Sequence, residues 1–343
     1  MQHEIVNQAP LLDEQGNVME AGYAKKLLPV YNRRDIKANG LRIKEWDYYL
    51  VNNDHFAVAL TIADNSYMGF DSISFLHFDE RWEKTKSAMQ VLTRGKKNLP
   101  STSAEGDVEV HNSNYKIKFS HKNGKRILDF HMERFIDETP ITGQIILTCE
   151  PEESMVIVIP FHKKKHFYYN QKINCMRAEG TVIVNGKEYI FNPGESFAVL
   201  DWGRGVWTYK NTWYWGSASG LADGVPFGFN IGYGFGDTSA ATENMLFYDG
   251  KAHKLSNVYW NIPLNENGKE DYLKPWTFTS DDGRFEMEFQ PVLDRASCTS
   301  VLVIKSDQHQ VFGRFTGKAV LDDGKVIEVK DLTGFAEKVY NRW

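Results

Sequence analysis

The residues best suited to chemistry lie in a tryptophan-rich part of the sequence. Asp201-Trp-Gly-Arg-Gly205 is followed by Trp207, Trp213 and Trp215, which places four of the nine tryptophans within 14 residues. A guanidinium at Arg204, beside an aspartate and indole rings, can orient a polar or anionic group, and the glycines allow close backbone approach. The alternative is a structural corner in which Arg204 pairs with Asp201 and the indoles pack as core. The spacing alone does not choose between them.

A second candidate segment alternates bulky and small residues from Phe227 to Gly236. In a strand, one face would be aromatic and the other nearly bare, so a ligand, or the strand that carries Trp213 and Trp215, could lie against the backbone. The glycines of this segment do not form a phosphate loop, because no helix follows them.

Three acidic or basic side chains are candidates for proton transfer. They are Asp201, Glu243 at the start of a predicted strand, and His131, which shares a strand face with Glu133. The alternative for His131 and Glu133 is an ordinary solvent-facing surface. The candidate ligand-binding residues are Trp202, Arg204, Trp207, Trp213, Trp215, Asn230, Tyr233 and Asn244. His162 and His166 have a helical metal-ligand spacing but lie among lysines and strand signals, so we expect no metal site and no cofactor.

Composition excludes several classes of protein. The net charge is -5 and no long basic block is present, which argues against nucleic acid as a partner. The three cysteines, Cys149, Cys175 and Cys298, form no CxxC pair, so a reducing compartment is expected. The N-terminus lacks a secretory pattern and no apolar run reaches the roughly 20 residues that span a bilayer, which predicts a soluble cytoplasmic protein. The oligomeric state is left undetermined.

Short alternating segments separated by polar turns predict an all-β protein with little helix. Asn123-Gly124 and Asn185-Gly186 are typical of two-residue hairpin turns. We expect an N-terminal arm over residues 1–40, a first β-barrel domain over 41–165 and a second over 166–343. The architecture is then two antiparallel lipocalin-like barrels or sandwiches packed together. The end of the chain, Gly334 to Trp343, is expected to dock as a last strand or helix, with Glu337 and Trp343 tying it to the body.

Several of these segments resemble one known family. They are the Asp201-Trp-Gly-Arg-Gly-x-Trp-x-Tyr block, Trp213-Tyr-Trp-Gly-Ser-Ala-Ser, Asn230-Ile-Gly-Tyr-Gly-Phe-Gly-Asp, Thr242-Glu-Asn and the closing Gly334-Phe-Ala-Glu-Lys-Val-Tyr-Asn-Arg-Trp343. Together they resemble the domain-of-unknown-function family 2804, which implies a fold rather than an activity. The layout is also similar to the carotenoid hydratase and tocopherol cyclase group, whose two lipocalin-like barrels bind hydrophobic polyene or prenyl substrates. Neither Asp201 nor Glu243 aligns with a catalytic acid of that group.

Three hypotheses for function follow. The first is a pocket for a small, largely apolar molecule, lined by the tryptophans and Tyr233, with Arg204 at its polar end. The second is a cofactor-independent isomerase, hydratase or cyclase, in which Asp201, Glu243 or His131 moves a proton and indole faces stabilise positive charge. The third is carbohydrate recognition by planar aromatic rings with Asp, Asn and Arg. A wholly structural aromatic core is the alternative to all three.

Overall fold

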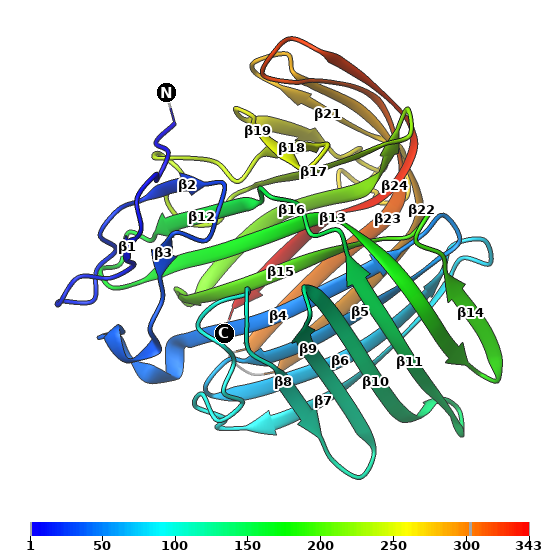
Figure 1. Cartoon of the computed structure of the whole chain (residues 1–343), viewed down its shortest axis with the longest axis horizontal. Helices are drawn as coiled ribbons and strands as arrows, with labels where there is room; N and C mark the ends of the chain where they lie inside the picture. Colours follow the sequence, from blue (N-terminus) through cyan, green and yellow to red (C-terminus); the bar gives the residue numbers. More distant parts are fainter. Residues whose placement is uncertain (1, 302–303, 343) are drawn as a thin grey trace.

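The protein is almost entirely β-structure, folded as two curled antiparallel sheets that form half-barrels (Figure 1). The structure is a computed structural model and describes residues 2–301 and 304–342. In these residues no helix has the length and apolar character needed to cross a membrane. The predicted architecture, all-β with little helix and two antiparallel lipocalin-like barrels or sandwiches, is confirmed, and each of the two units is a curled half-barrel sheet.

The first sheet has 13 strands and uses the chain up to residue 206. Its central strands pair in the order β7, β6, β5, β4, β15, β13, β11, β10, β9 and β8, while β12, β14 and β2 pair at its side. The bounds are β2 Gly22–Ala24, β4 Ile43–Asn52, β5 Phe56–Asp64, β6 Met68–His77, β7 Trp82–Val91, β8 Val108–His111, β9 Tyr115–Lys122, β10 Lys125–Ile136, β11 Thr139–Thr148, β12 Met155–Pro160, β13 Phe167–Val184, β14 Lys187–Phe191 and β15 Phe197–Val206.

The second sheet has nine strands and uses the chain from residue 210 onward. Its order is β19, β18, β17, β16, β24, β23, β22, β21 and β20. The bounds are β16 Lys210–Ala222, β17 Val225–Tyr233, β18 Met245–Tyr248, β19 Lys251–Lys254, β20 Val258–Asn261, β21 Trp276–Ser280, β22 Phe285–Val301, β23 Ile304–Val320 and β24 Val326–Arg342. The end of the chain is therefore a strand, and Trp343 lies outside the described residues.

The N-terminal segment is folded onto the first sheet. β1 (Ala9–Pro10) pairs with β3 (Pro29–Val30), and two 3-10 turns, η1 (Arg33–Asp35) and η2 (Gly40–Arg42), lead into β4. Ile5, Leu11 and Leu12 are buried in the same hydrophobic core as the strands of the first sheet. Residues 1–40 thus contribute to that core as well as linking to it.

The division between the sheets differs from the boundary expected near residue 165. Strands β13 to β15 are hydrogen-bonded within the first sheet, and the chain crosses to the second sheet only at residues 207–209. Hence the Asp201-Trp-Gly-Arg-Gly segment lies on β15 of the first sheet, not in the second. The boundary was expected near residue 165 because the pairing of β13 with β11 and β15 is not encoded in the local sequence of β13.

The tight turns agree with their sequence signature. Asn123 and Gly124 both have positive φ angles, 53° and 70°, and so do Asn185 and Gly186, at 50° and 74°. Two consecutive positive φ values are what a type I′ hairpin turn requires, and Asn-Gly adopts them readily. These turns fix the β9–β10 and β13–β14 hairpins.

The two sheets pack against each other through β4, β13 and β15 on one side and β16, β17 and β24 on the other. Because strand residues alternate between faces, β15 sends Leu200, Trp202 and Val206 into the core of the first sheet. Val199 belongs instead to the layer between the sheets, together with Trp215 and Phe335. Asp201, Gly203 and Gly205 share the parity of Val199, so they face the second sheet.

Gly203 provides space for an indole in this layer. It lies opposite Trp46 on β4, and a Cβ atom added to it would be 1.9 Å from Trp46 Cζ2. We expect Gly203→Ala to lower the free energy of unfolding by about 1–3 kcal/mol, because the partly buried Trp46 ring must move. Urea denaturation checks this, with Gly194→Ala as the control, since nothing lies within 4 Å of a Cβ there. An unchanged midpoint in Gly203→Ala would show that the Trp46 ring does not lie against this glycine.

Candidate active site between the two sheets

A row of polar side chains crosses the first sheet at the middle of the interface. Tyr48 on β4 is the direct cross-strand neighbour of Asp201 on β15, and Asp201 is the neighbour of Lys172 on β13. All three side chains are buried. Directly opposite residues in a sheet have side chains close together, so the register by itself places a phenol, a carboxyl and an ammonium side by side.

A matching row crosses the second sheet. Gln310 on β23 is opposite Glu337 on β24, Glu337 is opposite Trp215 on β16, and Trp215 is opposite Gly232 on β17. Gln310, Glu337 and Trp215 are all buried. The second row thus supplies another carboxyl group, an amide and an indole.

The two rows meet across the interface. Lys172 Nζ lies 2.9 Å from Asp201 Oδ1 and 3.7 Å from the centre of the Trp215 ring. Gln310 Nε2 donates to Glu337 Oε2 at 3.0 Å and lies 3.4 Å from the Tyr48 hydroxyl. Asn170 Nδ2 donates to Asp201 Oδ1 at 2.5 Å. The lysine is therefore held between a carboxylate of one sheet and an indole face of the other.

Glu243 joins these rows from the loop that precedes β18. A Cβ atom on Gly232 would lie 2.8 Å from Glu243 Oε1, so the carboxyl occupies space left open by that glycine. Asn230 Nδ2 donates to the Glu243 carbonyl at 2.8 Å, and the Gly232 N–H donates to Asn244 Oδ1 at 2.7 Å. The bare face of β17 is thus covered by the Glu243 carboxyl at Gly232 and by Cys175 of β13 at Gly228. We call Lys172, Asp201, Glu243 and Glu337 the inter-sheet cluster.

The charges of the inter-sheet cluster do not balance, since it holds three carboxyl groups and one lysine. Burial raises the pKa of Glu337 to about 7, and Asp201 adds to this, while the hydrogen bond from Trp213 and the charges of Arg295 and Lys172 oppose it. Burial also raises the pKa of Glu243, against the attraction of Lys172. A buried carboxyl without its own counter-ion is more stable with a proton than without one. Burial therefore favours the protonated forms of Glu337 and Glu243.

Aromatic rings enclose one end of the cluster. Trp213 Nε1 donates to Glu337 Oε1 at 2.9 Å, and the Trp213 ring packs edge-on against Trp207 and Phe235. The rings of Trp46 and Tyr168 complete this group. We call Trp46, Tyr168, Trp207, Trp213 and Phe235 the aromatic cluster. Burial, then the charges of Glu243, Asp201 and Glu337, raise the pKa of the Tyr168 phenol.

The structure brings together most of the residues singled out in the sequence. Asp201, Glu243, Trp215 and Asn230 contact or adjoin the cluster, and Asn244 supports it through Gly232. Trp207 and Trp213 belong to the aromatic cluster. The remaining predicted residues, Trp202, Arg204, Tyr233 and His131, lie elsewhere, so the predicted aromatic residues do not line one common pocket.

Arg204 is buried inside the first sheet and does not pair with Asp201. It forms an ion pair with Asp47 at 3.0 Å, lies 4.2 Å from the centre of the Trp202 ring and donates to the carbonyl oxygens of Trp46, Gly203 and Pro100. Residues 201 and 204 are three apart in a strand, so their side chains leave opposite faces of the sheet. The partner of Asp201 is Lys172, which the sequence analysis did not single out.

Tyr233 and His131 lie on other surfaces. Tyr233 stacks on Tyr214 at 4.2 Å and contacts Trp260, on the face of the second sheet that points away from the first. His131 Nε2 lies 3.0 Å from Glu133 Oε1, and both side chains are substantially exposed. The histidine and glutamate do share a strand face, but it is the solvent face of β10, as the alternative interpretation had it.

Lys172, Tyr48 and Asn170 were missed because no local signal marks them, and Glu337 was singled out only as a residue that ties down the end of the chain. Lys172 lies in the mostly polar segment Asn170-Gln-Lys-Ile-Asn174, a pattern that is typical of the edge of a strand. Only the register of β13 against β15 places it beside Asp201. No three His, Cys, Asp or Glu side chains of residues 2–301 and 304–342 are arranged to hold a metal ion.

Several solved structures share this fold. Kievitone hydratase from Nectria haematococca aligns with a TM-score of 0.51 at 9% identity, covering 98% of both chains. A candidate AttH protein from Nitrosomonas europaea aligns with a TM-score of 0.54 at 12% identity, covering 96% of this chain and 98% of its own. CghA with Sch210972 aligns with a TM-score of 0.50 at 11% identity, covering 88% of each. At these identities the similarity shows the fold alone.

None of the curated protein sequences matches this chain. The family model does match, over residues 2–343. The match includes every strand of both sheets and all residues of the inter-sheet cluster. The chain therefore belongs to the family described as Domain of unknown function (DUF2804).

Proposed function

We propose that this protein is a cofactor-independent enzyme that moves a proton on a largely apolar substrate, an isomerase, hydratase or cyclase by reaction type. The observation that supports this most is the inter-sheet cluster itself, in which three buried carboxyl groups share one lysine. A group that exchanges its proton near pH 7 is well matched to general acid–base catalysis.

The contacts suggest different roles for the carboxyl groups. Asp201 has Lys172 as its ion-pair partner, so it suits the role of the carboxylate that accepts a proton. Glu337 receives hydrogen bonds only from neutral groups, the indole of Trp213 and the amide of Gln310, among the residues described. It therefore suits the role of the acid that gives a proton, with Glu243 as a second acid.

The aromatic cluster supports an apolar substrate that develops positive charge. Protonation of a carbon–carbon double bond leaves a cation, and indole and phenol faces attract cations. Trp213 connects this cluster to Glu337 directly through its hydrogen bond. One structural neighbour, kievitone hydratase, is named for a reaction of this kind, but fold analogy does not establish such chemistry here.

Deuterium exchange tests the proposal without a known substrate. An apolar extract of the expressing cells is incubated in D2O with the protein, and mass spectrometry searches for compounds that gain carbon-bound deuterium. We expect labelling with the wild type, a loss of at least about 100-fold with Glu337→Gln, given what a general acid contributes, and no change with Glu328→Gln, an exposed residue of the same strand.

The result that would contradict the proposal is equally specific. A molecule that co-purifies in native mass spectrometry, yet takes up no deuterium at carbon with the wild-type protein, would identify a carrier of small apolar molecules. Labelling that persists in Glu337→Gln but disappears in Asp201→Asn would transfer the role of proton donor to Asp201.

A further inference from the structure

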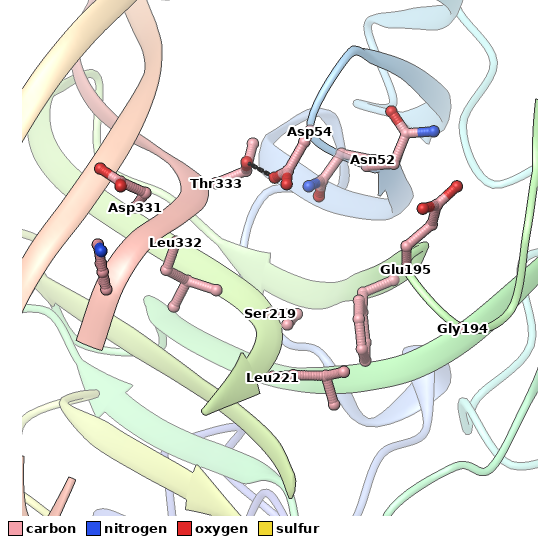
Figure 2. A pocket seen from close by; sticks show the side chains of 13 residues that line it. Asn52, Asp54, Gly194, Glu195, Ser219, Leu221, Asp331, Leu332 and Thr333 are labelled. Carbon is pink, nitrogen blue, oxygen red and sulfur yellow. Dashed lines mark hydrogen bonds between the residues drawn. The ribbon is translucent and has the colours of Figure 1, made fainter. Parts of the chain in front are cut away.

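A cavity of about 200 Å³ lies between the two sheets at the end of the interface opposite the aromatic cluster (Figure 2). Its walls come from four places in the chain: the β4–β5 turn (52–54), residues 194–197 at the start of β15, the end of β16 (219–221) and the start of β24 (330–333). Because each sheet supplies two of them, the cavity exists only when the sheets are packed together.

The walls of this cavity are amphipathic. Phe197, Leu221 and Leu332 supply apolar surface. The polar part includes Asp54, whose carboxylate is already occupied by Arg314 and Thr333. Glu195, Asp331 and Lys330 complete the charged groups of the wall, so acidic groups outnumber basic ones. Because Arg314 neutralises Asp54, the net charge of the wall is small, and its amide and hydroxyl side chains, Asn52, Asn53 and Thr333, suit an uncharged ring that carries a hydroxyl group.

The size of the cavity sets the size of its occupant. About 200 Å³ corresponds to the volume of roughly six or seven liquid water molecules at about 30 Å³ each. That is enough for a single substituted ring, but not for a larger polycyclic molecule. The occupant is therefore one end of a ligand, or a small ligand by itself.

A chain of polar contacts leads from the cavity toward the inter-sheet cluster. Ser219, in the cavity wall, accepts from Asn174 Nδ2 at 3.3 Å, and Asn174 Nδ2 also donates to Ser217 Oγ at 2.8 Å. Asn174 is two residues from Lys172 on β13, and both contact the second sheet. Asn174 Oδ1 is buried without a hydrogen-bond partner in the described part of the chain. Asn174 itself does not line the cavity, so Ser219 is the member of this chain that a ligand in the cavity can reach.

We infer that this cavity is a binding subsite for an uncharged, hydroxyl-bearing ring. The subsite does not rest on the proposed function, since its walls are independent of the chemistry assigned to Glu337.

Phenol is a suitable probe, with benzoate and benzylamine as charged analogues of similar size. We expect saturation-transfer NMR to detect phenol bound to the wild-type protein more tightly than either analogue. Two variants are designed to fill the cavity from different walls. One is Leu221→Trp on β16. The other is Gly194→Leu, at a position where no atom lies within 4 Å of an added Cβ. Each should weaken phenol binding at least fivefold. Leu264→Trp, at an exposed leucine outside the cavity, should not.

The outcomes separate this inference from the proposed function. Phenol binding that is absent in the wild type, or that survives in both cavity-filling variants with wild-type melting temperatures, would overturn the subsite. Tighter binding of benzylamine or benzoate would overturn the assigned ligand class. Glu337→Gln should bind phenol as the wild type does, so a failure of the deuterium-exchange experiment leaves this result intact.

Discussion

Replacing Arg204 with alanine is expected to lower the free energy of unfolding by about 3–5 kcal/mol, as breaking a buried ion pair does. The guanidinium is fully buried and has Asp47 as its ion-pair partner. Without it, the Asp47 carboxyl would remain in the core of the first sheet with no cation in contact. Burial already raises the pKa of Asp47, and Arg204 is the largest influence that opposes this.

Arg204 also connects separate parts of the chain. Its two terminal nitrogens donate to the carbonyl oxygens of Trp46 on β4 and Pro100 in the long loop before β8, each at 2.8 Å. Alanine would leave these oxygens without their donor, and an unsatisfied buried acceptor is itself destabilising. The loss should therefore appear as a lower melting temperature and a lower urea midpoint.

The control for this prediction is Arg134→Ala. The Arg134 side chain is 72% exposed and pairs with exposed Glu138, so its loss should change stability by no more than about 0.5 kcal/mol. If Arg204→Ala melted within a few degrees of the wild type, the role assigned to Arg204 would be wrong. The hypothesis that Arg204 orients the polar end of a ligand would then regain support.

The predicted and observed positions of Arg204 show what the sequence could and could not predict. Alternation and turn residues were enough to predict the all-β class and the hairpins. The sequence also made Asp201 and Glu243 candidates for proton transfer. The pairing of Arg204 with Asp201 failed because the segment 197–206 was not recognised as one strand. With that strand assigned, the period of two alone separates residues 201 and 204 onto opposite faces.

The partners of Asp201 could not be predicted from the local sequence. Lys172 and Tyr48 reach it through the register of β13 and β4 against β15, which joins segments far apart in the sequence. Glu337 was expected to tie down the end of the chain, and β24 does carry it into the sheet. Its position opposite Trp215 follows from the pairing of β24 with β16. Sequence thus predicted individual groups, and long-range register determined their partners.

Glu337→Gln is expected to remove a pH dependence of stability. Folding raises the pKa of Glu337 from an ordinary 4.5 to about 7, so between these values the folded state binds a proton that the unfolded state does not. The stabilisation is complete below about pH 4.5 and is lost as the pH rises through about 7. At about 1.4 kcal/mol per pKa unit, the wild type should lose about 3 kcal/mol relative to Glu337→Gln over this window.

Urea denaturation of both proteins at pH 5, 6, 7 and 8 measures this difference directly. Other titrating groups, including Lys254, whose pKa burial lowers to about 7, are common to both proteins and cancel in the comparison. Glu328→Gln, exposed on the same strand, should track the wild type at every pH. A constant difference between wild type and Glu337→Gln would mean that Glu337 holds no proton at neutral pH. Such a carboxyl could not serve as the proton donor, and the proposed chemistry would have to begin from Glu243.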